Sequence, residues 1–177
     1  MTGLSQFSSS SATEVTIRRA TGADAEAIVG VLGVVAAERV YSAIDQPWAA
    51  EQERSYLASL SPREATHVAV TGPRQIVGFQ TLDLWAPAIN SMKHVGQIGT
   101  FLAPEWRRRG VGQQLFRATQ SFAKRLEYTK FVIQVRASNA SAQAFYRRLG
   151  FRECGRLTRQ VLIDGQTDDE IILEYFL

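Results

Sequence analysis

The sequence predicts a single domain of the α/β or α+β class, with helices layered on a mixed β-sheet. Its length of 177 residues suits one domain, and a hydrophobic content of 45% with 21% charged residues supports a packed core. Runs with strand periodicity and runs with helical periodicity follow one another along the chain, without an internal repeat. We expect one domain over 14–177, preceded by a polar, serine-rich, disordered tail over 1–13.

The first half of the chain begins with a strand and two helices. Alternating apolar and polar residues predict a strand over 15–20. Thr21, with Asp24 three residues later, is a variant of the capping box and begins a helix that runs to about Glu38. A second helix is expected from about Trp48 to Leu60, where Ser-Pro ends it.

Three strands should follow these helices. The runs at 66–70 and 75–85 are separated by a Gly-Pro turn and predict a hairpin. The third strand covers 94–102, and Pro104 closes it because proline cannot donate to a sheet ladder.

The second half of the chain alternates helix and strand. Apolar residues at helical spacing follow Gly112 as far as Leu126, and 130–137 is a strand with an apolar centre. Asn139 can cap a further helix, and Gly150 can end it as a C′ residue. Two closing strands are expected over 151–163 and 169–176, joined by a turn at Asp164-Gly165.

Composition excludes several classes of protein. No window holds eighteen consecutive apolar residues, so a membrane span is not expected. The first thirteen residues lack the basic and apolar regions of a signal peptide. Cys154 is the single cysteine, so no internal disulfide can form, in agreement with a reducing cytoplasm. In its strand-like run we expect Cys154 to be a small core residue.

Charge is distributed unevenly along the chain. The segment 101–160 holds 13 Lys/Arg against 3 Asp/Glu, although the net charge of the whole chain is only +3. This asymmetry favours an anionic partner for the middle of the chain, and a solvated basic face explains it equally well.

The stretch RRRGVGQQLF at 107–116 contains the candidate anion-binding loop. A helix N-terminus exposes unpaired N–H groups, and glycines at 110 and 112 allow a phosphate to approach them. The loop is not a P-loop, because no Lys-Ser/Thr pair follows Gly112. It is not the dinucleotide fingerprint either, because Leu115 stands where a third glycine is needed.

Two motifs together resemble the GCN5-related N-acetyltransferase (GNAT) superfamily. The first, [QR]-x-x-G-x-[GA] after an apolar-x-Pro strand end, is matched by 107–112 behind Leu102-Ala103-Pro104. The second is a helix that reads N-x-x-A-x-x-x-Y-x-x-x-G-F. Its matching positions are Asn139, Ala142, Tyr146, Gly150 and Phe151.

This resemblance implies a mostly antiparallel sheet of about seven strands and about four helices. The strands at 94–102 and 130–136 would splay apart and form a cleft for acetyl-CoA, the expected co-substrate, and no metal is expected. The pyrophosphate would lie on the loop amides and the pantetheine arm beside Leu102. The coenzyme-binding residues implied are Leu102, Ala103, Arg107, Arg108, Arg109, Gly110, Val111, Gly112, Gln113, Asn139 and Tyr146.

The resemblance also implies direct acyl transfer from the thioester to an amine through a ternary complex. The backbone N–H of Leu102 would meet the charge on the carbonyl oxygen, and Tyr146 would protonate the leaving thiolate. The general base stays open: His94 acting through water, Glu38 at the end of the first helix, and relay to bulk water are the alternatives.

The acceptor is expected to be a small primary amine or an amino acid. Its site would involve 38–60, the 84–95 loop and the last hairpin, with Tyr41, Trp48 and Trp85 as a candidate aromatic wall. The alternatives are a protein N-terminal or lysine acetyltransferase and a catalytically inactive CoA-binding module. A nucleic-acid binder ranks last, because the chain has no recognisable module of that kind. The sequence leaves the oligomeric state open, a homodimer included.

Overall fold

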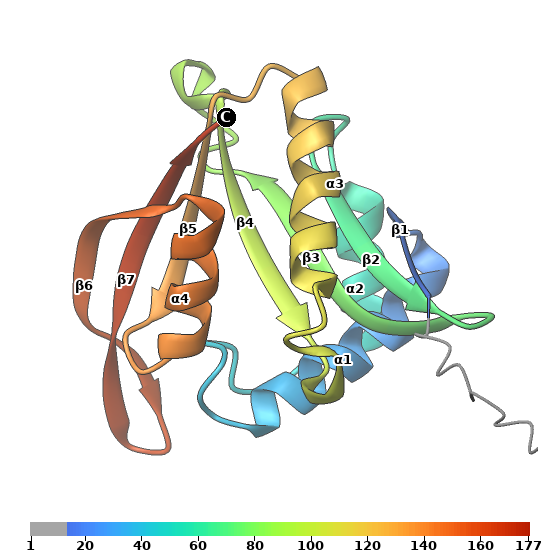
Figure 1. Ribbon diagram of the computed structural model, residues 1–177, viewed down its shortest axis with the longest axis horizontal. Coiled ribbons are helices and arrows are strands. Elements are labelled where there is room, and N and C mark those ends of the chain that lie inside the picture. The colour runs from blue at the N-terminus through green and yellow to red at the C-terminus, as the bar shows by residue number, and fades with distance from the viewer. Residues whose placement is uncertain (1–13) are drawn as a thin grey trace, which may run out of the picture.

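One mixed sheet organises the computed structural model, which describes residues 14–177 (Figure 1). The strands are β1 (Val15–Arg19), β2 (Ala65–Thr71), β3 (Gln75–Leu84), β4 (Val95–Leu102), β5 (Lys130–Arg136), β6 (Arg152–Ile163) and β7 (Gln166–Phe176). Their spatial order is β1-β2-β3-β4-β5-β7-β6. All neighbouring pairs are antiparallel except β4 and β5, as the predicted mixed, mostly antiparallel sheet requires. The tail expected over 1–13 lies outside the described residues.

Four helices cover the two faces of the sheet (Figure 1). They are α1 (Ala25–Ala37), α2 (Ala50–Ser59), α3 (Val111–Arg125) and α4 (Ala140–Leu149). Helices α3 and α4 lie on the face toward the viewer in Figure 1, and α1 and α2 lie behind the sheet. The fold is therefore the predicted α+β arrangement, a sheet flanked by four helices, and the helices form a layer on each face.

The turn and cap residues carry out most of the roles that the sequence predicts. Asp24 accepts hydrogen bonds from the Thr21 backbone N–H at 2.8 Å and from both terminal nitrogens of Arg18 at 2.8 Å. Gly150 ends α4 in the left-handed conformation, with φ of 100°. The turn at 164–165 likewise has positive φ at both residues, and it joins β6 to a β7 that begins three residues earlier than expected.

The parallel strands β4 and β5 pair over three positions only. Val95, Gly96 and Gln97 stand opposite residues 130–132, and beyond them the two strands diverge (Figure 1). The splay that the resemblance implied is confirmed. It leaves the last five residues of β4 paired on one side only, with β3.

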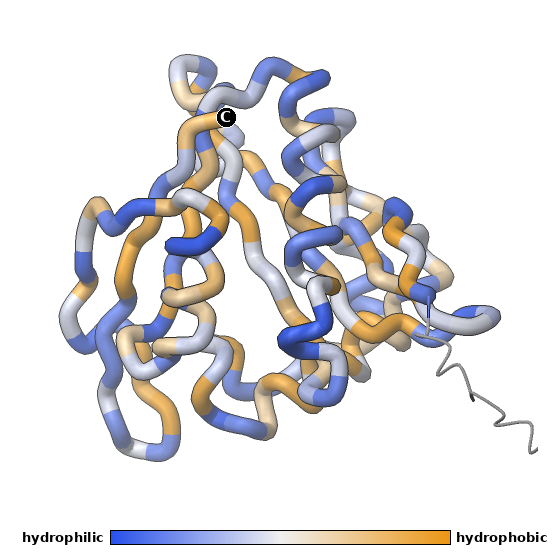
Figure 2. The backbone as a smooth tube through the Cα atoms, viewed as in Figure 1, coloured by the Kyte–Doolittle hydropathy of each residue, from blue (hydrophilic) through white to orange (hydrophobic). Residues whose placement is uncertain are grey.

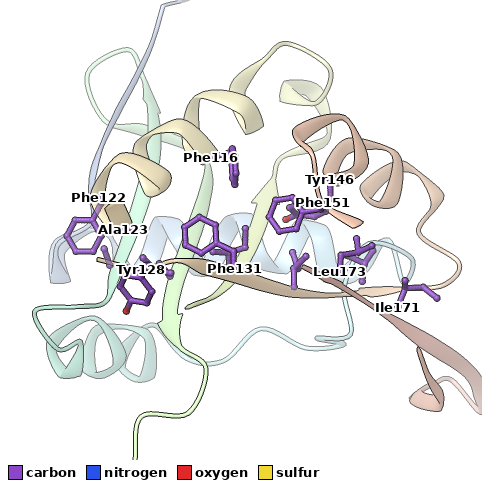
Figure 3. Packing of buried hydrophobic residues seen from close by; sticks show 14 residues of the cluster. Phe116, Phe122, Ala123, Tyr128, Phe131, Tyr146, Phe151, Ile171 and Leu173 are labelled. Atoms are coloured by element: carbon purple, nitrogen blue, oxygen red, sulfur yellow. The ribbon is translucent and has the colours of Figure 1, made fainter. Parts of the chain in front are cut away.

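The largest hydrophobic core lies between the sheet and the helices α3 and α4 (Figure 3). The rings of Phe116, Phe131, Phe151 and Tyr175 meet at centroid distances of 5.0–6.4 Å. A separate cluster packs α1 against the other face of the sheet. Figure 2 shows hydrophobic segments along the strands of the sheet.

Two further observations concern the surface. Cys154 was expected in the core, but it is exposed on the edge strand β6, at a register shift where it has no paired residue on β7. None of the helices between residues 14 and 177 combines the length and the apolar character that crossing a bilayer requires.

A buried histidine gives the fold a specific pH dependence. His67 on β2 is 5% exposed, and its Nδ1 lies 3.0 Å from the Thr119 hydroxyl. Burial, together with the charges of Arg19 and Arg125, lowers the pKa of His67 to about 4. Because the unfolded chain has a pKa near ~6.5, it binds the proton more readily than the folded chain. The stability that neutral His67 confers is complete above pH ~6.5 and is lost as the pH falls toward 4.

We therefore expect the free energy of unfolding to fall by ~2–3 kcal/mol between pH 7 and 4 on account of His67. Urea denaturation at a series of pH values measures this. His67→Gln should flatten the profile over that range, whereas His94→Gln, a change at the exposed second histidine, should leave it as in the wild type. A His67→Gln profile as steep as the wild-type one would contradict the assignment.

Candidate functional site

The glycine loop presents backbone N–H groups at the start of α3. Gly110 adopts φ of 79° and precedes the first helical residue, and Arg108 is also left-handed, with φ of 58°. The first helical hydrogen bond at this end runs from the Gln114 N–H to the Gly110 carbonyl at 3.1 Å. The amides of residues 111–113 consequently have no partner within the helix and can bind an anion, as the sequence predicts.

A cleft of about 720 Å³ opens over this loop. Its walls are the end of β4, the loop and start of α3, the inner side of α4, and Tyr41 from the segment that follows α1. Eight of the eleven predicted coenzyme residues line it. They are Leu102, Arg107, Arg108, Gly110, Gly112, Gln113, Asn139 and Tyr146.

The other three predicted residues face elsewhere. Val111 is 1% exposed and packs in the core under α3, and Ala103 packs beside the same cluster. The guanidinium of Arg109 lies 5.3 Å from the centre of the Trp106 ring. Their side chains do not line the cleft, although the backbone of Val111 forms part of the first turn of α3.

The three arginines at 107–109, the deep-blue stretch before α3 in Figure 2, make different contacts. Arg107 forms a two-point ion pair with Glu38, at 2.9 Å between Nη1 and Oε1. It also donates to the Leu102 carbonyl at 3.2 Å and lies 4.1 Å from the centre of the Tyr41 ring. Arg107 thus fastens the chain after α1 to the end of β4. Among the described residues, Arg108 and Arg148, both on the cleft wall, form no ion pair.

The end of β4 offers unpaired backbone groups to the cleft. Ala103 donates to Val77 at 3.0 Å, and Trp85 donates to Val95 at 3.2 Å. In an antiparallel pair with this register, the backbone N–H and C=O groups of odd-numbered β4 residues bond to β3. Those of even-numbered residues point away from β3, toward the side of β5. Since β5 has diverged there, the N–H groups of Thr100 and Leu102 face the gap without a strand partner.

Tyr146 is held at this gap by two polar residues that sequence reasoning missed. Its hydroxyl donates to Thr100 Oγ1 at 2.7 Å, and the same oxygen accepts a bond from Gln80 Nε2 at 2.6 Å. Gln80 is fully buried and stands opposite Thr100 on β3. Burial raises the pKa of Tyr146 above the ordinary tyrosine value. A polar Gln in the apolar run of β3 was the one available signal for this network.

Asn139 caps α4 as predicted. Its Oδ1 accepts from the Ala142 N–H at 3.0 Å. Its Nδ2 donates to the Tyr41 carbonyl at 3.3 Å, which ties the loop behind α1 to the start of α4. This side chain therefore connects the two walls of the cleft.

The candidate bases lie away from the end of β4 or are already paired. His94 is exposed and directly precedes β4, eight residues from Leu102, which at ~3.3 Å per residue is ~26 Å of extended chain. Glu38 is held by Arg107. Tyr41 and Trp48 line different cavities and Trp85 lines neither, so these three residues do not form one aromatic wall.

Solved acetyltransferases share this fold. A ribosomal-protein-alanine N-acetyltransferase from Brucella melitensis superposes with a TM-score of 0.83 at 22% identity, over 92% of this chain and 99% of that one. A GCN5-related N-acetyltransferase from Kribbella flavida superposes with a TM-score of 0.80 at 23% identity, over 92% of this chain and 98% of that one. For a GNAT superfamily phosphinothricin acetyltransferase from Sinorhizobium meliloti, in complex with acetyl-CoA, the TM-score is 0.82 at 18% identity, over 92% of this chain and 88% of that one.

A sheet that parts between two parallel strands, with a glycine turn and a helix N-terminus at the gap, defines the class of fold. Residues 35–151, more than half of the chain and the part that holds both motifs, match the acetyltransferase (GNAT) family. The chain belongs to this family. A comparison with curated proteins finds no match.

The dual contact of Asn139 yields a prediction on stability. Asn139→Ala removes the cap oxygen and the donor to Tyr41, and we expect a loss of ~1 kcal/mol in the free energy of unfolding. Asn139→Asp keeps an oxygen that can accept from Ala142 and should lie close to the wild type. Urea denaturation at pH 7 measures both. Equal losses for the two variants would show that the bond to Tyr41, and not the cap, stabilises this region.

Proposed function

We propose that this acetyltransferase transfers an acetyl group from acetyl-CoA directly to a primary amine of a small molecule or amino acid. The observation that supports this most is the unpaired N–H of Leu102, which faces the same cleft as the buried hydroxyl of Tyr146. A donor for the carbonyl oxygen and a proton for the thiol are the two groups that such a transfer requires.

The cleft residues fit an anionic coenzyme with an amide-containing arm. The amides of 111–113 at the positive end of α3 suit the pyrophosphate, and Arg108 and Arg148 add positive charge at the wall. The unpaired edge of β4 at Thr100 and Leu102 can pair with pantetheine amides as a strand would. When bound, acetyl-CoA supplies the activated acetyl group as a thioester.

The residues of the chain then divide the chemistry. The Leu102 N–H donates to the carbonyl oxygen, and the hydrogen bond strengthens as negative charge gathers there. The bond from the amine nitrogen to the carbonyl carbon forms, the carbon–sulfur bond breaks, and the proton of Tyr146 goes to the departing sulfur. The nitrogen loses its surplus proton to water, and water returns a proton to Tyr146, so that the products are the amide and the free thiol. The Gln80–Thr100 pair keeps the Tyr146 hydroxyl at one position between turnovers.

Burial raises the pKa of Tyr146, so the hydroxyl carries the proton that a general acid must hold at neutral pH. No His, Asp or Glu lines this cleft within residues 14–177. We therefore propose that the acceptor ammonium loses its proton to water before attack. The rate should rise with pH as the neutral amine becomes more abundant.

Replacing the acid tests the mechanism. Tyr146→Phe keeps the ring packing and removes the proton, so we expect kcat to fall ~100-fold, within the usual range for a general acid. Thiol release with a reactive amine measures turnover, and a thermal-shift titration confirms that acetyl-CoA still binds. Tyr175→Phe, which removes a hydroxyl bonded to Gln120 outside the cleft, is the matched control. Unchanged turnover in Tyr146→Phe would remove this residue from the acid role.

The loop can be tested by binding alone. In the wild type, acetyl-CoA should raise the unfolding temperature saturably, and dephospho-CoA and ATP should raise it less. Gly112→Asp places a carboxylate beside the amides of the loop and should abolish the shift. Gly112→Ala controls for size, because its Cβ would lie 3.1 Å from the ring of Phe145 and demands only a small displacement. Wild-type affinity in Gly112→Asp would mean that the phosphate site lies elsewhere.

A further inference from the structure

A second cavity, of about 560 Å³, lies on the face of the sheet opposite α3 and α4. Its walls are α2 with the loop before it, and the outward-facing residues of β3 and β4. The lining residues from the helix and loop are Ile44, Trp48, Gln52, Glu53 and Tyr56. Those from the strands are Phe79, Thr81, Asp83, Gln97, Ile98, Gly99 and Phe101.

The second cavity adjoins the coenzyme cleft at one residue. Phe101 lines both, and its ring stacks on Phe79 with centroids 4.8 Å apart. Its neighbours Thr100 and Leu102 are the residues whose N–H groups face the cleft. A molecule in the second cavity can therefore reach the end of β4, where the acetyl group would be transferred, from the face opposite α4.

Two carboxylates line the second cavity, and no Lys, Arg or His does. Glu53 is 2% exposed; its Oε2 accepts from Trp48 Nε1 at 2.6 Å, and its Oε1 has no hydrogen-bond partner in residues 14–177. Asp83 accepts from the Tyr56 hydroxyl at 2.5 Å. Neither carboxylate forms an ion pair with a described residue.

Such an arrangement is costly without a cation. Burial raises the pKa of Glu53 and of Asp83, and the charge of Asp83 raises that of Glu53 further. A positively charged group between them would offset the loss of solvation and the mutual repulsion. The faces of Trp48 and Tyr56 attract the same kind of charge.

We propose that the second cavity is the acceptor site and selects a small amine with a second positive charge, held by Glu53 and Asp83. This inference rests on the proposed function, which leaves the acceptor open between amines and amino acids. A free carboxylate on the acceptor would meet two carboxylates and no cation. The favoured class is therefore a diamine or oligoamine rather than an amino acid.

The register places Asp83 at the distal end of the acceptor. Asp83 stands opposite Gln97, five residues before Leu102, a separation of ~16 Å along the strand at ~3.3 Å per residue. That is too far for Asp83 to take a proton from the attacking amine. Its role is to bind the group that does not react.

Calorimetric titration of the protein saturated with CoA tests this directly. The probes are cadaverine, n-pentylamine and lysine, which share a five-carbon chain and differ in charged groups. We expect cadaverine to bind at least ~10-fold more tightly than either of the others, a difference of ~1.4 kcal/mol. Comparable affinities for cadaverine and n-pentylamine would overturn the proposal.

Two near-isosteric variants test the residues. Glu53→Gln and Asp83→Asn keep an acceptor for Trp48 and Tyr56 and remove the charge, so each should bring the cadaverine preference down by ~5-fold or more. Glu51→Gln, a change of an exposed carboxylate on the same helix outside the cavity, should retain the full preference. A preference that survives both cavity variants would overturn the assignment.

A further variant tests the charge of the cavity without altering either carboxylate. Gln97→Lys adds a positive charge to the wall opposite Asp83 and should weaken cadaverine binding while the side chains of both carboxylates stay in place. Unaltered binding would count against the site.

Turnover measurements separate this inference from the proposed function. Thiol release with n-pentylamine as readily as with cadaverine would refute this inference alone. Tight cadaverine binding without turnover of any amine would refute the proposed function and would leave the second cavity as a diamine-binding site.

Discussion

The divergence of β4 and β5 is the constraint on which the rest of this molecule depends. Three paired positions hold the strands together, and beyond Gln97 the backbone N–H and C=O groups of the even-numbered residues of β4, which point toward β5, have no strand partner. Unpaired backbone groups in a protein interior are costly unless they are satisfied by another group. A strand edge of this kind is accordingly a binding surface, and the cleft forms where a continuous sheet would have closed it.

Several contacts hold the two sides of the gap at a fixed separation. Arg107, which follows β4 in the sequence, forms an ion pair with Glu38, and Arg136 on β5 donates to the Arg39 carbonyl. Asn139 adds its bond to the Tyr41 carbonyl. The segment after α1 therefore bridges the gap from both sides, and it contributes Tyr41 to the first cleft and Ile44 to the second cavity. These residues are basic or polar, but their work is structural.

The charge asymmetry of the sequence becomes a division between the two faces of the sheet. The basic segment 101–160 contains the loop, α3 and α4, and it contributes Arg108 and Arg148 to the cleft. The more acidic remainder contributes Glu53 and Asp83 to the cavity on the opposite face. In the function that we propose, an anionic coenzyme and a cationic acceptor approach the end of β4 from opposite faces of the sheet without competing for the same groups.

The sequence by itself determined the element order, the glycine loop, the cap at Asn139 and the left-handed Gly150, because each depends on residues close together in the chain. It also indicated the family through two motifs. Tertiary structure alone decided that Arg107 pairs with Glu38, that Gln80 and Thr100 hold Tyr146, and that Glu53 and Asp83 share a cavity. These partners lie 20 to 69 residues apart where a bond joins them, and only strand register and helix packing bring them together.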